Sequence, residues 1–136
     1  MKAARLTLIL ATAAVCGCTT TRPPSDVAHL QLESDDSPTV MVSKIGLERK
    51  NGVLVVWGYV LKRIHATDTT QTHLDVTLYD DQGRLLRSTV EHFQPRQIPR
   101  RYRRPDFATY RIGLDPLPER TARITVRAHD GAEDHP

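Results

Sequence analysis

The feature that most constrains the fold is an alternation of apolar and polar residues, repeated in short segments across residues 40–129. Leu74, Val76 and Leu78, for example, are each separated by one polar residue. A period of two places alternate side chains on opposite faces of a β-strand, so the apolar set faces a core. Asn51-Gly52 is a strong signal for a two-residue hairpin turn between two such segments. We predict six strands, at residues 40–48, 53–61, 73–79, 84–93, 107–114 and 121–129.

These strands predict one all-β domain, an antiparallel β-sandwich of the size of an immunoglobulin or fibronectin type III domain. A chain of 136 residues has room for one such domain and is too short for an enzyme with a separate cofactor domain. A seventh strand near Val27 and a small closed β-barrel are the alternatives. The segment 53–61 is apolar on both faces, and Gly46 is expected to mark a bulge in the first strand.

The N-terminus has the pattern of a secretory signal peptide. Lys2 and Arg5 are followed by the apolar run 6–15 and then by small residues. Ten residues of helix rise about 15 Å, which is half of a bilayer core of about 30 Å. The run therefore predicts export rather than a membrane span.

The end of this segment, Val15-Cys16-Gly17-Cys18, resembles the lipobox of bacterial lipoproteins. The resemblance implies cleavage after residue 17 and acyl chains on Cys18, which together would form an essentially permanent membrane anchor. Thr19 follows the cysteine where members of that family retained in the inner membrane often have Asp. The resemblance therefore implies an outer-membrane lipoprotein of a Gram-negative bacterium that faces the periplasm.

The expected organisation is a signal peptide at 1–17, a lipidated N-terminus and flexible linker at 18–38, a β domain at 39–129 and a polar tail at 130–136. The segment 18–38 is rich in Thr, Pro, Ser and Asp, which is typical of a tether. After cleavage the formal net charge falls from +3 to +1, because Lys2 and Arg5 are lost. No free thiol would remain, which excludes disulfides and cysteine chemistry.

The most prominent local feature of the expected domain is an arginine-rich loop within residues 94–106, which also holds three prolines. Arginine suits bidentate contacts to phosphate or carboxylate groups, so the candidate partners are an envelope protein, anionic lipid or peptidoglycan. Nucleic acid is not expected. The alternative is a solvated loop whose arginines pair with aspartates of the domain. The candidate binding residues are Arg96, Arg100, Arg101, Tyr102, Arg103 and Arg104.

Trp57 and Tyr59 form a second candidate contact surface, since amphipathic aromatic residues bury a large area at little cost in entropy. The favoured alternative is a tryptophan in the core of the sandwich, with Gly58 between the two residues relieving crowding. We expect no metal and no cofactor, because no His-x-His pair is present. The weak alternative is a metal site formed by His65, His73, His92 and His129.

The chain has no Gly-x-Ser-x-Gly, His-Glu-x-x-His or phosphate-binding glycine motif, so we do not expect an enzyme. The sequence instead predicts a non-catalytic binding or adaptor subunit of an envelope or secretion assembly. The alternative function is a periplasmic carrier or sensor of a metal ion or small ligand.

Overall fold

The computed structural model describes residues 22–100 and 106–131 of the chain. Cys18 and the signal segment, Arg101, Tyr102, Arg103, Arg104 and the tail beyond Gly131 lie outside the described residues. Within the described ranges the structure is nearly all β, with seven strands in two sheets and no closed barrel. The predicted β-sandwich is confirmed. None of the helical structure in these ranges is long and apolar enough to cross a membrane.

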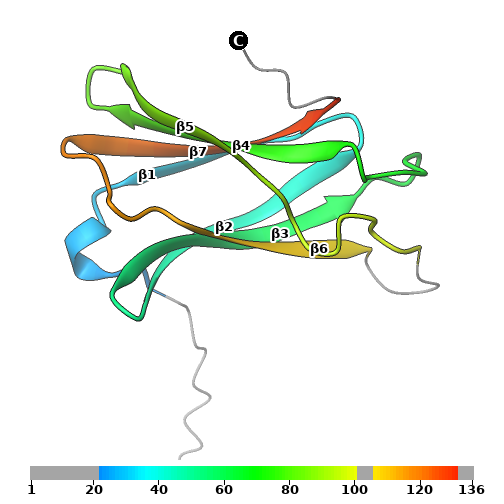
Figure 1. Cartoon of the computed structure of the whole chain (residues 1–136), viewed down its shortest axis with the longest axis horizontal. Helices are drawn as coiled ribbons and strands as arrows, with labels where there is room; N and C mark the ends of the chain where they lie inside the picture. Colours follow the sequence, from blue (N-terminus) through cyan, green and yellow to red (C-terminus); the bar gives the residue numbers. More distant parts are fainter. Residues whose placement is uncertain (1–21, 101–105, 132–136) are drawn as a thin grey trace, which may run out of the picture.

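The two sheets pack face to face (Figure 1). The four-stranded sheet has the order β1 (Gln31–Asp35), β7 (Thr121–Asp130), β4 (Thr72–Asp80) and β5 (Leu85–Glu91). The three-stranded sheet has the order β2 (Val40–Lys50), β3 (Val53–Lys62) and β6 (Phe107–Gly113). All strand pairs are antiparallel except β1 with β7, which is parallel.

The core lies between the sheets and is filled by the residues that the alternation predicts. Leu74, Val76 and Leu78 of β4 have no exposed surface, and neither do Ile124 and Val126 of β7. The predicted hairpin turn is also confirmed, because Asn51 and Gly52 both have positive φ, at 51° and 81°. Local sequence periodicity is thus sufficient to define the inward face of β4 and β7.

The prediction of a flexible linker up to residue 38 is wrong for the described part of that segment. A 3-10 turn, η1 (Ser25–Val27), leads into β1, and Val27 and Leu30 are buried in the core with 4% and 8% exposure. β1 pairs with β7 from Gln31 to Asp35. The physical reason is that two buried apolar side chains and one strand ladder offset the entropy of ordering this segment. The domain therefore begins well before residue 39.

The prediction of a bulge at Gly46 is also wrong, because the shift in register between β2 and β3 lies between Val42 and Lys44. Gly46 lies opposite Trp57, and a Cβ atom at position 46 would approach the indole ring to 2.8 Å. The glycine is needed because the tryptophan ring covers it.

Gly58 meets a different and tighter constraint on the inward side of β3. The hydroxyl of the buried Tyr110 donates a hydrogen bond of 2.8 Å to the backbone carbonyl of Lys44. A Cβ atom at position 58 would lie 1.8 Å from that carbonyl oxygen and 2.4 Å from the tyrosine hydroxyl. Gly58 does relieve crowding, as expected, but for Tyr110 rather than for the tryptophan.

Candidate functional site

The outer face of the three-stranded sheet carries a continuous row of aromatic side chains. Trp57 and Tyr59 belong to β3, and Phe107 begins β6. The ring centroids of Trp57 and Tyr59 are 6.3 Å apart at an interplanar angle of 80°, and those of Tyr59 and Phe107 are 5.9 Å apart at 86°. Tyr59 is 38% exposed and Phe107 is 44% exposed. We call these three residues the aromatic surface.

Trp57 is not a core residue of the sandwich. It is half-buried on the outer side of β3, whereas Leu54, Val56 and Val60 of the same strand point into the core. The ammonium group of Lys44 lies 4.9 Å from the centroid of its ring, which is a cation–π distance. The favoured alternative of a core tryptophan is therefore wrong, and both predicted contact residues lie on the outer side of the sheet.

A shallow hollow of about 240 Å³ opens beside the row, lined by Ser43, Tyr59, Leu61 and Phe107. Ser43 lies at the bulge of β2, so the irregular register of that edge strand shapes one wall. A hollow of this size and lining can accept one apolar side chain of a partner. Phe107 extends the row beyond the two predicted residues, and its signal in the sequence is an aromatic residue directly after the arginine-rich loop.

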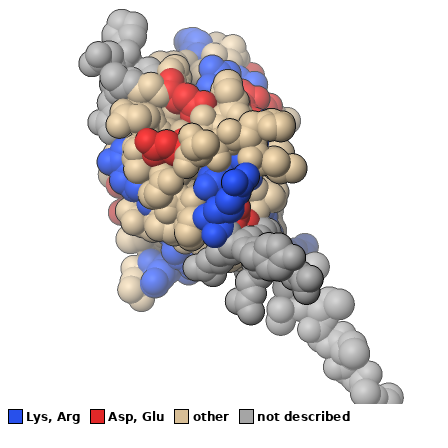
Figure 2. All heavy atoms as spheres, turned by 90° about the vertical axis from the view of Figure 1, so that its right-hand side faces the viewer, with Lys and Arg blue, Asp and Glu red and all other residues tan. Residues whose placement is uncertain are grey.

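The described part of the arginine-rich loop is hydrogen-bonded to the neighbouring loop 63–71. The guanidinium group of Arg96 donates to the carbonyl of Thr70 at 2.8 Å, and that of Arg100 donates to the carbonyl of Ile64 at 3.4 Å. Ile98 between them is fully buried. Figure 2 views the molecule from this side and shows one patch of Lys or Arg in the middle of the face, with further basic and acidic side chains around it.

The alternative is that the loop arginines pair with Asp75, Asp80, Asp81 or Asp106, and for Asp80 and Asp81 the structure shows other partners than Arg96 or Arg100. Asp80 pairs with Arg84 at 2.8 Å, and Asp81 pairs with Arg120 at 3.6 Å. Arg96 and Arg100 use backbone carbonyls instead, as given above. Their charge therefore remains available to an anion at this end of the sandwich.

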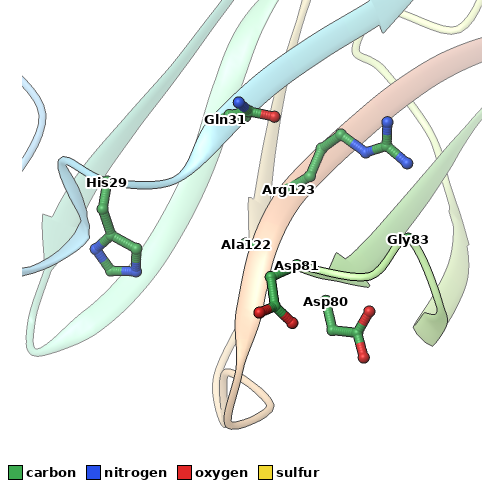
Figure 3. A pocket seen from close by; sticks show the side chains of 7 residues that line it. All are labelled: His29, Gln31, Asp80, Asp81, Gly83, Ala122 and Arg123. Carbon is green, nitrogen blue, oxygen red and sulfur yellow. The ribbon is translucent and has the colours of Figure 1, made fainter.

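A second hollow of about 440 Å³ lies beside the turn between β4 and β5 (Figure 3). In Figure 3, His29 lies on one side, and Asp80 and Gly83 lie on the other. A backbone hydrogen bond from Arg84, with further help from the Arg84 guanidinium and the amide of Gln82, holds the pKa of Asp80 below its ordinary value. Asp80 therefore serves the turn, as a carboxylate in this position commonly does.

The four-stranded sheet brings together two of the four histidines considered as metal ligands. His73 on β4 lies directly opposite His129 on β7, and Asp75 lies two residues along β4. One ligand atom from each of these residues can be chosen so that the three atoms lie within 4.8 Å of one another. His65 and His92 do not belong to this cluster. Asp75 is not among the ligands predicted from the sequence, although His73-x-Asp75 places both side chains on one face of a strand.

Comparison with protein-family models, with curated proteins and with solved structures gives no significant match to this chain. The indications of function therefore lie in the surfaces of the domain. Two of these surfaces have a chemistry that ordinary packing does not require. One is the aromatic surface, with Arg96 and Arg100 at the loop end of the sandwich, and the other is the His73–Asp75–His129 cluster.

Proposed function

We propose that this protein is a lipid-anchored, periplasm-facing module of the outer membrane that binds another envelope protein and performs no catalysis. The anchor rests on the lipobox resemblance around Cys18. The binding role rests on one observation, the exposed edge-to-face row of Trp57, Tyr59 and Phe107 on the outer side of the three-stranded sheet.

The row indicates a contact surface. Single exposed aromatic residues are common on protein surfaces, but a connected set beside a hollow is not needed for the stability of the domain. Edge-to-face pairs are worth about 0.5–1.5 kcal/mol each, and here they fix the rings in one arrangement before any partner arrives. Rings that are already ordered lose little side-chain entropy on binding. Aromatic residues are also the side chains most often found at the energetic centre of protein interfaces.

The charges around the row favour an acidic partner segment. Lys44 lies over the ring of Trp57, and Arg96 and Arg100 lie at the loop end of the sandwich. A partner that inserts an apolar side chain into the hollow and carries carboxylates beside it matches this pattern.

The contact surface can be tested by site-specific photo-crosslinking in intact cells of the native host. A crosslinking amino acid at position 59 should capture one discrete protein. The same amino acid at position 85 is the control, because Leu85 is 58% exposed but belongs to the other sheet. Equal products from both positions would contradict the proposed surface.

The captured protein should then bind the chain less tightly when Tyr59 and Phe107 are changed to Ser. A central interface aromatic contributes about 2 kcal/mol or more, which corresponds to a loss of affinity of roughly thirtyfold. Leu85→Ser is the matched control and should leave the affinity unchanged. Unchanged binding by the Tyr59→Ser, Phe107→Ser variant would exclude the aromatic surface.

The anchor needs its own test, because a contact surface and a lipid are independent features. Cys18→Ser should release the protein from outer-membrane fractions, and globomycin should block cleavage of the signal segment. A Cys18→Ser protein that still sediments with outer membranes would contradict the lipid anchor while leaving the contact surface intact.

A further inference from the structure

We infer that His73, Asp75 and His129 form a binding site for a divalent transition-metal ion of the zinc class. The site lies on the outward face of the four-stranded sheet, on the adjacent strands β4 and β7 (Figure 1). The inference does not depend on the aromatic surface, which belongs to the other sheet.

The register of the sheet brings the three side chains together. His73 and His129 are direct cross-strand partners, and their rings stack at a centroid distance of 5.2 Å and an interplanar angle of 12°. In the register of β4 and β7, Asp75 lies opposite Arg127, so it is the diagonal neighbour of His129 on the same face. Because β4 and β7 are neighbours inside the sheet, both backbones are held by strand ladders on their two sides.

The distances within the cluster are close to those of a metal site. The Nε2 atom of His73 lies 3.4 Å from Asp75 Oδ1, and the Nδ1 atom of His129 lies 3.7 Å from Asp75 Oδ2. Zinc binds nitrogen and oxygen at about 2.0–2.2 Å, so two ligand atoms in a tetrahedral site are separated by about 3.3 Å. The three ligand atoms lie within 4.8 Å of one another, so they must approach by at most about 1.5 Å to surround one ion.

The donor set selects the kind of ion. Two imidazoles and one carboxylate suit Zn²⁺, Co²⁺, Ni²⁺ or Cu²⁺, whereas Ca²⁺ and Mg²⁺ prefer sites made of oxygen alone. Three protein ligands leave one tetrahedral position for water or for a ligand from a second molecule. The site thus resembles open metal centres in its ligand number rather than closed structural ones.

The unequal burial of the three side chains suits an exchangeable ion. The side chain of His73 is 1% exposed and that of Asp75 is 16% exposed, so these two ligands are held firmly by the sheet. The side chain of His129 is 46% exposed and gives solvent a path to the site. Such a site can take up an ion from the surroundings and release it again.

The test is a zinc titration of the full chain by calorimetry. The chain carries Cys16→Ser and Cys18→Ser, so that no thiolate competes for the ion. One zinc ion should bind at saturation and raise the melting temperature, and Mg²⁺ should do neither. Absence of saturable zinc binding would overturn the inference.

Single substitutions then assign the ligands. His129→Ala and Asp75→Asn should each weaken zinc binding at least about tenfold, since even residues that only orient a metal's ligands through hydrogen bonds commonly account for that factor. Because the side chain of His129 is partly exposed, its removal leaves the core unchanged. His65→Ala is the matched control, an exposed histidine in the loop 63–71 that should not affect the affinity.

Cobalt provides a second measurement that a purely structural role would not change. Co²⁺ bound at this site should give visible d–d absorption, and His129→Ala should abolish or shift the spectrum. Wild-type zinc affinity and an unchanged cobalt spectrum in His129→Ala would overturn the assignment of this residue. Loss of zinc binding in His65→Ala alone would place the ion elsewhere and overturn the inference as a whole.

Discussion

The carboxylate of Asp130, the last residue of β7, accepts hydrogen bonds that link three parts of the chain. Its Oδ1 atom accepts from the hydroxyls of Ser37 at 2.9 Å and Thr72 at 2.7 Å. Its Oδ2 atom accepts from the amide of Thr39 at 3.1 Å and from the hydroxyl of the same residue at 2.6 Å. The carboxylate therefore links β7 to the start of β4 and to the segment that leads into β2.

Asp130→Asn should destabilise the domain strongly, because an amide group has only one acceptor oxygen. Whichever oxygen is replaced, two donors then face an NH₂ group. A hydrogen bond to a charged group contributes about 1.5–3 kcal/mol, and the partial exposure of this site favours the lower end of that range. We expect a loss of about 3 kcal/mol in the free energy of unfolding, measured by urea denaturation at pH 7. Small domains have about 5–15 kcal/mol in total.

The same carboxylate predicts a pH dependence that the variant should lack. Partial burial raises the pKa of Asp130, but the hydrogen bonds from Thr39, Thr72 and Ser37 outweigh it and hold the pKa below its ordinary value of 3.8. A folded-state pKa below the unfolded one gives a contribution that is complete above about pH 4 and is lost as the pH falls through the folded pKa. The difference in stability between wild type and Asp130→Asn should therefore shrink below about pH 4.

Asp115→Asn is the matched control, because Asp115 is an exposed carboxylate in a loop. Its denaturation curve should coincide with that of the wild type within about 0.5 kcal/mol. The reasoning is refuted if Asp130→Asn unfolds at the wild-type urea concentration at pH 7. It is equally refuted if the difference between the two proteins stays constant down to pH 2.

Two further substitutions test the packing. Gly58→Ala should lower the free energy of unfolding by about 3 kcal/mol or more in the same urea assay. Adding Tyr110→Phe should not restore the stability, because the nearest obstacle is the backbone carbonyl of Lys44. Gly113→Ala is the control that should be tolerated, since its Cβ would meet its nearest neighbour at 3.6 Å. Leu30→Ala should cost about 2–3 kcal/mol by thermal and urea unfolding, since its side chain is buried in the core, whereas a side chain on a flexible linker would give no change.

The fold class could be predicted because its evidence is local. In β4, β6 and β7 the apolar residues of one face are buried and the other face carries mostly polar residues, so the alternation can be read from each segment by itself. β1 offers no such pattern, because Leu32 is its only partly buried residue and the other four are exposed. Its place in the sheet depends on parallel pairing with β7, almost a hundred positions away in the sequence. The weakly apolar residues near Val27 give only the alternative of a seventh strand, and pairing over that distance leaves no local signal for the partner strand.

The orientation of Trp57 could not be predicted for a related reason. β3 is apolar on both faces, so a period of two does not distinguish inside from outside. Gly58 indicates the orientation of the strand, because the hydroxyl end of Tyr110 fills the space that a side chain at position 58 would take. With Gly58 facing inward, its neighbours Trp57 and Tyr59 must face outward. The aromatic surface therefore lies on the face of β3 opposite to Gly58 and the buried Val56 and Val60.

The metal site follows the same logic on the other sheet. A search along the sequence for two histidines on one strand fails, because the second histidine comes from β7 and the third ligand is a carboxylate. Antiparallel pairing of β4 with β7 creates the cluster, and the pairing is set by the buried faces of both strands. Because the two candidate sites face outward from opposite sheets with the packed core between them, zinc binding and partner binding share no side chain. Energetic coupling between them would require the core to have a second packing arrangement, and close-packed interiors resist such continuous deformation.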